Sequence, residues 1–83
     1  MMSKILIYTT KICPYCVMAK RLLTQKGAAY TEINVDDTQV REEMMRKTGR
    51  RTVPQIYIGE LHVGGFDDLY ALEREKKLDA LLN

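Results

Sequence analysis

Cys13 and Cys16 are the two cysteines of this chain, and only two residues separate them. A C-x-x-C pair can contribute to a metal site, form a structural disulfide, or alternate between dithiol and disulfide in a redox reaction. The residues around the pair, and the elements that carry it, decide among these three chemistries.

A structural disulfide and a zinc site both have weak support. A disulfide across so short a loop removes little entropy from the unfolded chain, so it stabilises the fold little. Structural zinc needs four ligands, and beyond the two cysteines the chain offers one distant histidine, His62. We therefore expect no metal site, and we interpret His62 as a solvent-facing or hydrogen-bonded structural residue.

The position of the pair favours redox chemistry. The apolar residues at 4–9 predict a buried strand, and a helix is predicted to begin at about Pro14. Cys13 would then lie at a helix N-terminus, where unpaired N–H groups and the helix dipole stabilise a thiolate and lower the thiol pKa. Cys16 follows one turn later on the same side, so we expect Cys13 to be the nucleophile and Cys16 the resolving thiol.

The first half of the chain predicts a β-α-β-α order. The helix at 14–26 has apolar residues at a 3.6-residue period and stops at Gly27. A second strand is expected at 28–35. A second helix is expected at about 38–47, with Asp36 as its N-cap in a capping box.

The second half predicts a hairpin followed by helix. Residues 55–65 read as two strands joined by a type II′ turn at Gly59-Glu60, and residues 69–82 as one helix or two short ones. A β-α-β unit implies parallel strands, whereas the hairpin adds an antiparallel pair. The fold class is therefore α/β, with a four-stranded mixed sheet flanked by helices in the order β-α-β-α-β-β-α.

The bulk composition sets the class of protein. The 83 residues are 46% hydrophobic and 29% charged, which predicts a single globular domain over 1–83. A net charge of +2 is too mild to indicate nucleic acid as a partner. The chain has no apolar run long enough for a membrane span or a signal peptide, so we expect a cytoplasmic protein.

Three motifs together identify a family resemblance. CPYC at 13–16, TVPQIYI at 52–58 and GGFDDL at 64–69 resemble the dithiol glutaredoxins, especially the bacterial glutaredoxin 3 type, over nearly the whole chain. The resemblance implies a thioredoxin-like fold and a thiol–disulfide oxidoreductase with glutathione as co-substrate and no tightly bound cofactor. The partners it implies are glutathione and disulfide-containing or glutathionylated proteins, with ribonucleotide reductase as one candidate; we expect a monomer.

The resemblance also assigns residues to glutathione. Val53-Pro54 corresponds to the family's cis-proline, and the Val53 backbone is implied to pair with the cysteinyl part of glutathione. Without the resemblance, an ordinary trans proline is the expectation. Thr52 and Tyr15 are implied to flank the bound tripeptide.

The GGFDD segment has two interpretations. Asp67 or Asp68 can cap the helix that follows a glycine turn. The resemblance implies close backbone approach at Gly65, with the N–H groups of Phe66 and Asp67 binding the γ-glutamyl carboxylate and the Asp67 side chain binding its ammonium group. We expect this segment to serve both purposes.

One position departs from the family pattern. Dithiol glutaredoxins usually carry a lysine three residues before the first cysteine, facing the glycyl carboxylate of glutathione. Here Thr10 stands in that position and Lys11 follows it. Lys11 is the first candidate for this contact, and Arg50 and Arg51 beside the proline loop are alternatives, although a solvated helix end also explains these bases.

Two other redox functions and a silent binding module are alternatives. A thioredoxin would share the fold, but thioredoxins carry tryptophan before the first cysteine and this chain has none. Glutaredoxins that bridge an iron–sulfur cluster usually have glycine or serine where Pro14 stands. The intact thiol pair speaks against a binding module without catalysis.

Overall fold

A four-stranded mixed sheet forms the centre of the computed structural model, which describes residues 4–83. The strands are β1 (Ile5–Thr9), β2 (Thr31–Asn34), β3 (Gln55–Ile58) and β4 (Leu61–Gly64), and they lie in the order β2-β1-β3-β4. β1 pairs with β2 in parallel, whereas β3 is antiparallel to both β1 and β4. The mixed sheet predicted from the sequence is therefore confirmed.

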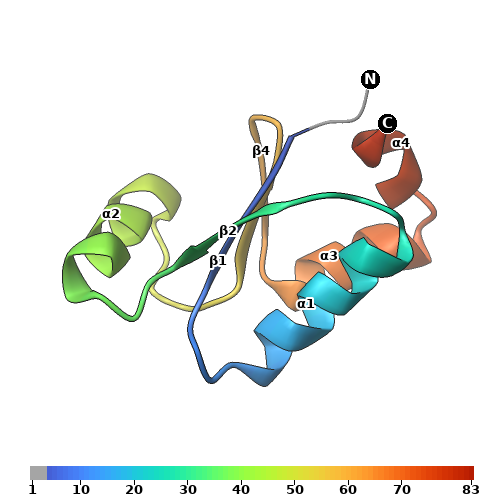
Figure 1. Cartoon of the computed structure of the whole chain (residues 1–83). Coiled ribbons are helices and arrows are strands. Elements are labelled where there is room, and N and C mark those ends of the chain that lie inside the picture. The colour runs from blue at the N-terminus through green and yellow to red at the C-terminus, as the bar shows by residue number, and fades with distance from the viewer. Residues whose placement is uncertain (1–3) are drawn as a thin grey trace.

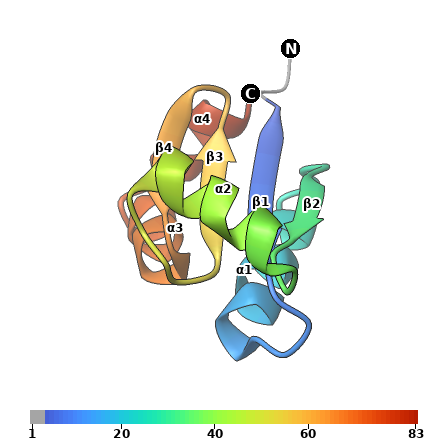
Figure 2. The ribbon, with the colours of Figure 1, turned by 90° about the vertical axis from the view of Figure 1, so that its left-hand side faces the viewer.

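Helices cover both faces of this sheet. α1 (Pro14–Gln25), α3 (Phe66–Arg74) and the short α4 (Leu78–Leu82) lie on one face, and α2 (Thr38–Thr48) lies on the other (Figure 1). Figure 2, seen from the α2 side, shows α2 in front of the sheet with α1 behind it. The predicted element order is confirmed, and the C-terminal segment forms two helices rather than one.

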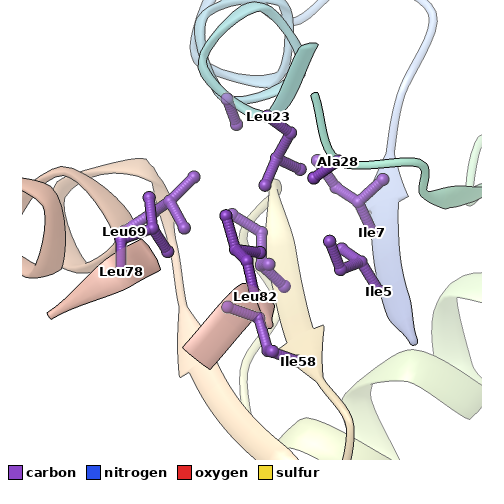
Figure 3. Close-up of a cluster of buried hydrophobic side chains, with 10 residues drawn as sticks. Ile5, Ile7, Leu23, Ala28, Ile58, Leu69, Leu78 and Leu82 are labelled. Atoms are coloured by element: carbon purple, nitrogen blue, oxygen red, sulfur yellow. The ribbon is translucent and has the colours of Figure 1, made fainter. Parts of the chain in front are cut away.

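The two-sided covering explains the apolar runs of β1 and β3. Ile5 and Ile7 point towards α1 and α3, where Leu23 and Leu69 complete a buried cluster together with Ile58 (Figure 3). The alternate residues of the same strands pack on the other face, in a second cluster: Tyr8 and Tyr57 with Val35 and Met44. A strand buried on both faces is a nearly continuous run of apolar residues, and in these two strands Thr9 and Gln55 are the buried polar exceptions.

α2 begins at Thr38 as predicted, but its N-cap residue differs from the prediction. Its N-cap is Asp37, whose carboxylate accepts hydrogen bonds from the N–H groups of Gln39 and Val40. The predicted cap Asp36 instead accepts a 2.9 Å hydrogen bond from the backbone N–H of Lys11. Asp36 thus holds the segment before the cysteines through this hydrogen bond. The next residue, Asp37, caps the helix instead.

The remaining boundaries follow from local chemistry. Gly27 takes φ of +70° after α1, and Gly59 takes φ of +60° in the two-residue turn between β3 and β4. Both values lie in the region that favours glycine. Within residues 4–83, no helix is long and apolar enough to cross a bilayer.

Candidate active site

The two cysteines are joined as a disulfide at the N-terminus of α1, with their Cα atoms 5.2 Å apart. Cys13 is the N-cap residue, and its Sγ accepts a 3.1 Å hydrogen bond from the Cys16 N–H. Cys13 is half-buried, whereas Cys16 is only 1% exposed. The first sulfur can therefore meet a substrate, while the second is shielded behind it.

The local backbone favours a thiolate at Cys13 when the pair is reduced. Pro14 occupies the first helical position, where its missing N–H would have no partner in any case. The Cys16 N–H, one of the unpaired donors of the first turn, points at the Cys13 sulfur. A hydrogen bond and the positive end of the helix dipole both stabilise negative charge there.

The proline loop between α2 and β3 lies against this sulfur. The Val53–Pro54 peptide bond is cis, as the family resemblance implies, so the expectation of an ordinary trans proline is wrong. The Sγ of Cys13 is 3.8 Å from the backbone oxygen of Val53. The start of α1, this loop and the start of α3 meet at one end of the sheet (Figure 1).

An open cleft of about 270 Å³ lies between the proline loop and the start of α3. Its lining residues are Tyr15, Arg50, Thr52, Val53, Pro54, Gln55, Gly65, Phe66, Asp67 and Asp68. Of the eight residues predicted to contact glutathione, seven line this cleft and Lys11 does not. Two lining residues, Gln55 and Asp68, were not among the candidates for this contact.

Gly64 and Gly65 shape the α3 wall of the cleft. Gly65 is the N-cap of α3, and the Asp68 carboxylate accepts a 2.9 Å hydrogen bond from its N–H. The expectation that Asp67 or Asp68 is the N-cap is therefore wrong. Gly64 takes φ of +112°, and a Cβ atom there would run into the Asp68 carboxylate. The turn thus requires glycine, and it leaves Asp67 exposed on the cleft lining.

Aromatic rings extend the same wall. Tyr15 of α1 and Phe66 of α3 have ring centroids 6.3 Å apart, and Phe66 is 5.8 Å from Tyr70. Tyr15 is 58% exposed, so its ring stands beside the half-buried Cys13 and the cleft rather than in the core. A peptide-sized ligand in the cleft would meet this ring next to the reactive sulfur.

Arg50 is the candidate cation that the cleft contains. Its guanidinium Nη1 is 3.7 Å from Asp68 Oδ2, and both side chains are about half exposed, so this ion pair is weak. Arg51 does not line the cleft; its backbone oxygen accepts a 2.8 Å hydrogen bond from Arg41. Lys11 is exposed and its backbone is fastened to Asp36.

Gln55, which lines the cleft, and His62, which does not, form a polar pair that sequence reasoning did not connect. His62 Nε2 is 2.7 Å from Gln55 Oε1, and Gln55 Nε2 donates to Thr52 Oγ1 at 3.3 Å. Burial, followed by the charge of Arg50, holds the pKa of His62 below its ordinary value, against the opposing effect of Asp68. The one feature of the sequence that could have indicated this pair is Gln55 itself, a polar residue at the start of a continuously buried strand.

Metal-ligating side chains are not clustered in the part of the chain that the structure describes. No group of three or more histidine, cysteine, aspartate or glutamate side chains lies close enough to hold an ion.

The comparisons with known proteins agree with this geometry. The sequence model of the glutaredoxin family matches residues 5–63. The chain is 58% identical over 83 residues to a glutaredoxin of Pseudomonas aeruginosa, with 99% of each chain covered. It is 50% identical over 82 residues to glutaredoxin 3 of Escherichia coli K12, with 98% of this chain and 99% of the relative covered.

A solved structure extends the similarity to three dimensions. The crystal structure of a buckwheat glutaredoxin–glutathione complex superposes with a TM-score of 0.86, at 32% identity, over 94% of this chain and 74% of the other. The sheet order and the flanking helices described above therefore have a counterpart among solved glutaredoxin structures.

Proposed function

Because this chain belongs to the glutaredoxin family of thiol–disulfide oxidoreductases, we propose that glutathione is its reducing co-substrate and that the cleft beside Cys13 binds it. The observation that carries the proposal is the meeting of three features at one end of the sheet. These are a half-buried sulfur at a helix N-terminus, the backbone of the cis-proline loop beside it, and a cleft with charged groups at its wall.

The chemistry of glutathione matches the cleft group by group. The tripeptide carries a thiol, two carboxylates and one ammonium group. The backbone of Val53 lies beside the reactive sulfur and suits the cysteinyl residue. The N–H groups at the start of α3, on Phe66 and Asp67, suit the γ-glutamyl carboxylate, and the Asp67 carboxylate suits the ammonium group.

The glycyl carboxylate requires a cation, and we assign it to Arg50 rather than Lys11. Arg50 lines the cleft, whereas the Lys11 backbone is fastened to Asp36 outside it. A guanidinium also matches a carboxylate with two parallel donors. The weak ion pair of Arg50 with Asp68 gives way at little cost when a ligand carboxylate arrives.

The reaction is a sequence of thiol–disulfide exchanges. The Cys13 thiolate attacks the glutathione sulfur of a glutathionylated client, and the client leaves as a thiolate. A second glutathione thiolate then attacks the glutathione sulfur on Cys13, which forms glutathione disulfide and regenerates the Cys13 thiolate. Each exchange moves one disulfide bond, and the net result is that the client mixed disulfide and one glutathione thiol become a client thiol and glutathione disulfide.

Cys16 supplies the second route. Its thiolate attacks the Cys13 sulfur of a mixed disulfide, expels the bound thiol, and forms the Cys13–Cys16 disulfide. Two glutathione molecules then reduce that disulfide. Protein disulfides need this route because the client must be released from Cys13. A monomeric state, a cytoplasmic location and ribonucleotide reductase as a client stay predictions.

A coupled assay tests the proposed co-substrate. The protein is given a small glutathione mixed disulfide with glutathione, glutathione reductase and NADPH, and in parallel thioredoxin reductase with NADPH. Turnover is expected with glutathione and not with thioredoxin reductase. Free cysteine, which has a thiol but lacks the γ-glutamyl and glycyl ends, should support a much slower reaction at equal thiolate concentration. Reduction by thioredoxin reductase alone would contradict the proposal.

A further inference from the structure

A hydrogen-bonded chain runs beneath the cleft floor from β4 to the proline loop. Gln55 is 0% exposed and lies between Thr52 and His62. Its amide Nε2 donates to Thr52 Oγ1 at 3.3 Å, and its Oε1 is 2.7 Å from His62 Nε2. Thr52 in turn lines the cleft. The chain therefore links a residue of β4 to the surface where a ligand would lie.

The orientation of the Gln55 amide sets the direction of both hydrogen bonds. Because the Gln55 amide nitrogen faces the Thr52 hydroxyl, the amide oxygen faces His62 and can only accept. His62 must therefore carry a proton on Nε2. Leaving a fully buried amide oxygen without a hydrogen-bond donor destabilises the folded protein. The bond to His62 therefore constrains the orientation of the Gln55 amide.

The position of His62 is fixed by its own neighbours. Its ring stacks on Tyr57, with centroids 4.8 Å apart and planes inclined by 21°. The pairing of β3 with β4 shifts register between Ile56 and Tyr57, which sets His62 opposite Tyr57 and Gly64 opposite Ile56. One irregular pairing thus places both His62 and the glycine turn of the cleft wall.

We propose that His62 is a positioning residue which, through Gln55, holds Thr52 and the proline loop in the form that binds glutathione. The inference rests on the proposed glutathione site. His62 does not line the cleft and acts through Gln55. Without the His62 donor, the Gln55 amide must turn to find another partner, and the Thr52 hydroxyl loses the donor that fixes it.

This role predicts a selective defect in glutathione binding. Cys13 and Cys16 lie on α1, and the described chain of hydrogen bonds does not include them. Reduction of their disulfide by dithiothreitol, which has no γ-glutamyl or glycyl group, should therefore not depend on His62. A loss that came from general unfolding would affect both reductants.

The test compares three variants in the glutathione-coupled assay and in a dithiothreitol assay. His62→Phe keeps a ring to stack on Tyr57 but removes the donor. His62→Gln places an amide nitrogen where Nε2 stands and should rescue the interaction. Leu61→Thr, at an exposed neighbouring position of β4, is the matched control.

We expect His62→Phe to raise KM for the glutathione mixed disulfide about five- to tenfold, with kcat and the dithiothreitol rate changed less than twofold. His62→Gln and Leu61→Thr should stay within twofold of the wild type. An unchanged KM in His62→Phe, or an equal loss with both reductants, would overturn the role of His62. Absence of glutathione-dependent turnover in the wild type would instead overturn the proposed function.

A measurement on the wild type keeps the inference testable if His62→Phe does not fold. Nitrogen NMR of the histidine ring distinguishes a proton on Nε2 from one on Nδ1. The hydrogen-bond directions require a proton on Nε2 at neutral pH. A ring protonated on Nδ1 alone would contradict them and remove the basis of the proposal.

Discussion

The Sγ of Cys13 lies 3.8 Å from the backbone oxygen of Val53, although the two residues are 40 positions apart in the chain. This contact brings a helix N-terminus and the cis-proline loop to one point. We propose that a cysteine residue in a mixed disulfide with Cys13 lies along the Val53 peptide.

The choice of cation is the first prediction. Arg50→Gln should raise KM for the glutathione mixed disulfide about fivefold, because an exposed charge contact contributes about 1 kcal/mol. Arg51→Gln and Lys11→Gln are the matched controls and should change KM less than twofold, since neither residue lines the cleft. If Lys11→Gln raises KM more than Arg50→Gln does, the assignment is wrong and Lys11 binds the glycyl carboxylate.

The glycine turn gives the second prediction. Gly64→Ala places a Cβ against the Asp68 carboxylate at φ of +112°, so we expect a loss of about 2–3 kcal/mol in the free energy of unfolding. Gly49→Ala, at φ of +73° with open space around it, should lose about 1 kcal/mol from backbone strain alone. Urea unfolding measures both. Equal losses would show that the Asp68 contact does not matter.

The pH dependence of stability gives the third prediction. The Thr9 hydroxyl, which donates at 2.6 Å, and then Lys20 hold the pKa of Glu32 below its ordinary value. The ionised carboxylate therefore stabilises the fold above the unfolded-state pKa, and this contribution is lost as pH falls through the lower folded-state pKa. Because the Glu32 side chain is 38% exposed, solvent screening limits the contribution to less than about 1 kcal/mol.

Glu32→Gln should accordingly lower the free energy of unfolding at pH 7, and lower it less near pH 3, which lies below the ordinary pKa of a glutamate. Urea unfolding at the two pH values checks this. Glu43→Gln, on the exposed part of α2, is a control that should change stability little at either pH. The same loss from Glu32→Gln at both pH values would mean that the charge is not responsible.

Local patterns predicted most of the fold. The apolar run of β1, the helix that begins at Pro14 and the turn at Gly59 each follow from nearby residues, and they were found where expected. The N-cap of α2 was missed by one residue because Asp36 and Asp37 are equally able to cap a helix. The choice depends on the Lys11 N–H, which reaches Asp36 from a distant part of the chain.

The parts of the site that belong to the three sequence motifs could be predicted. The cysteine pair, the proline loop and the glycine turn gave most of the cleft lining, yet the cis form of Val53–Pro54 required the family resemblance. The contact between Gln55 and His62 could not be predicted, because it depends on a register irregularity between β3 and β4. Pairing of that kind is a property of the assembled sheet.

The roles of the two sulfurs are tested most directly by Cys13→Ser and Cys16→Ser in the glutathione-coupled assay with a small glutathione mixed disulfide. Cys16→Ser should keep substantial activity, because the half-buried Cys13 alone completes deglutathionylation, and it should lose reduction of a protein disulfide. Cys13→Ser should lose both activities. Full activity of Cys13→Ser on the mixed disulfide would contradict the assignment of Cys13 as the nucleophile.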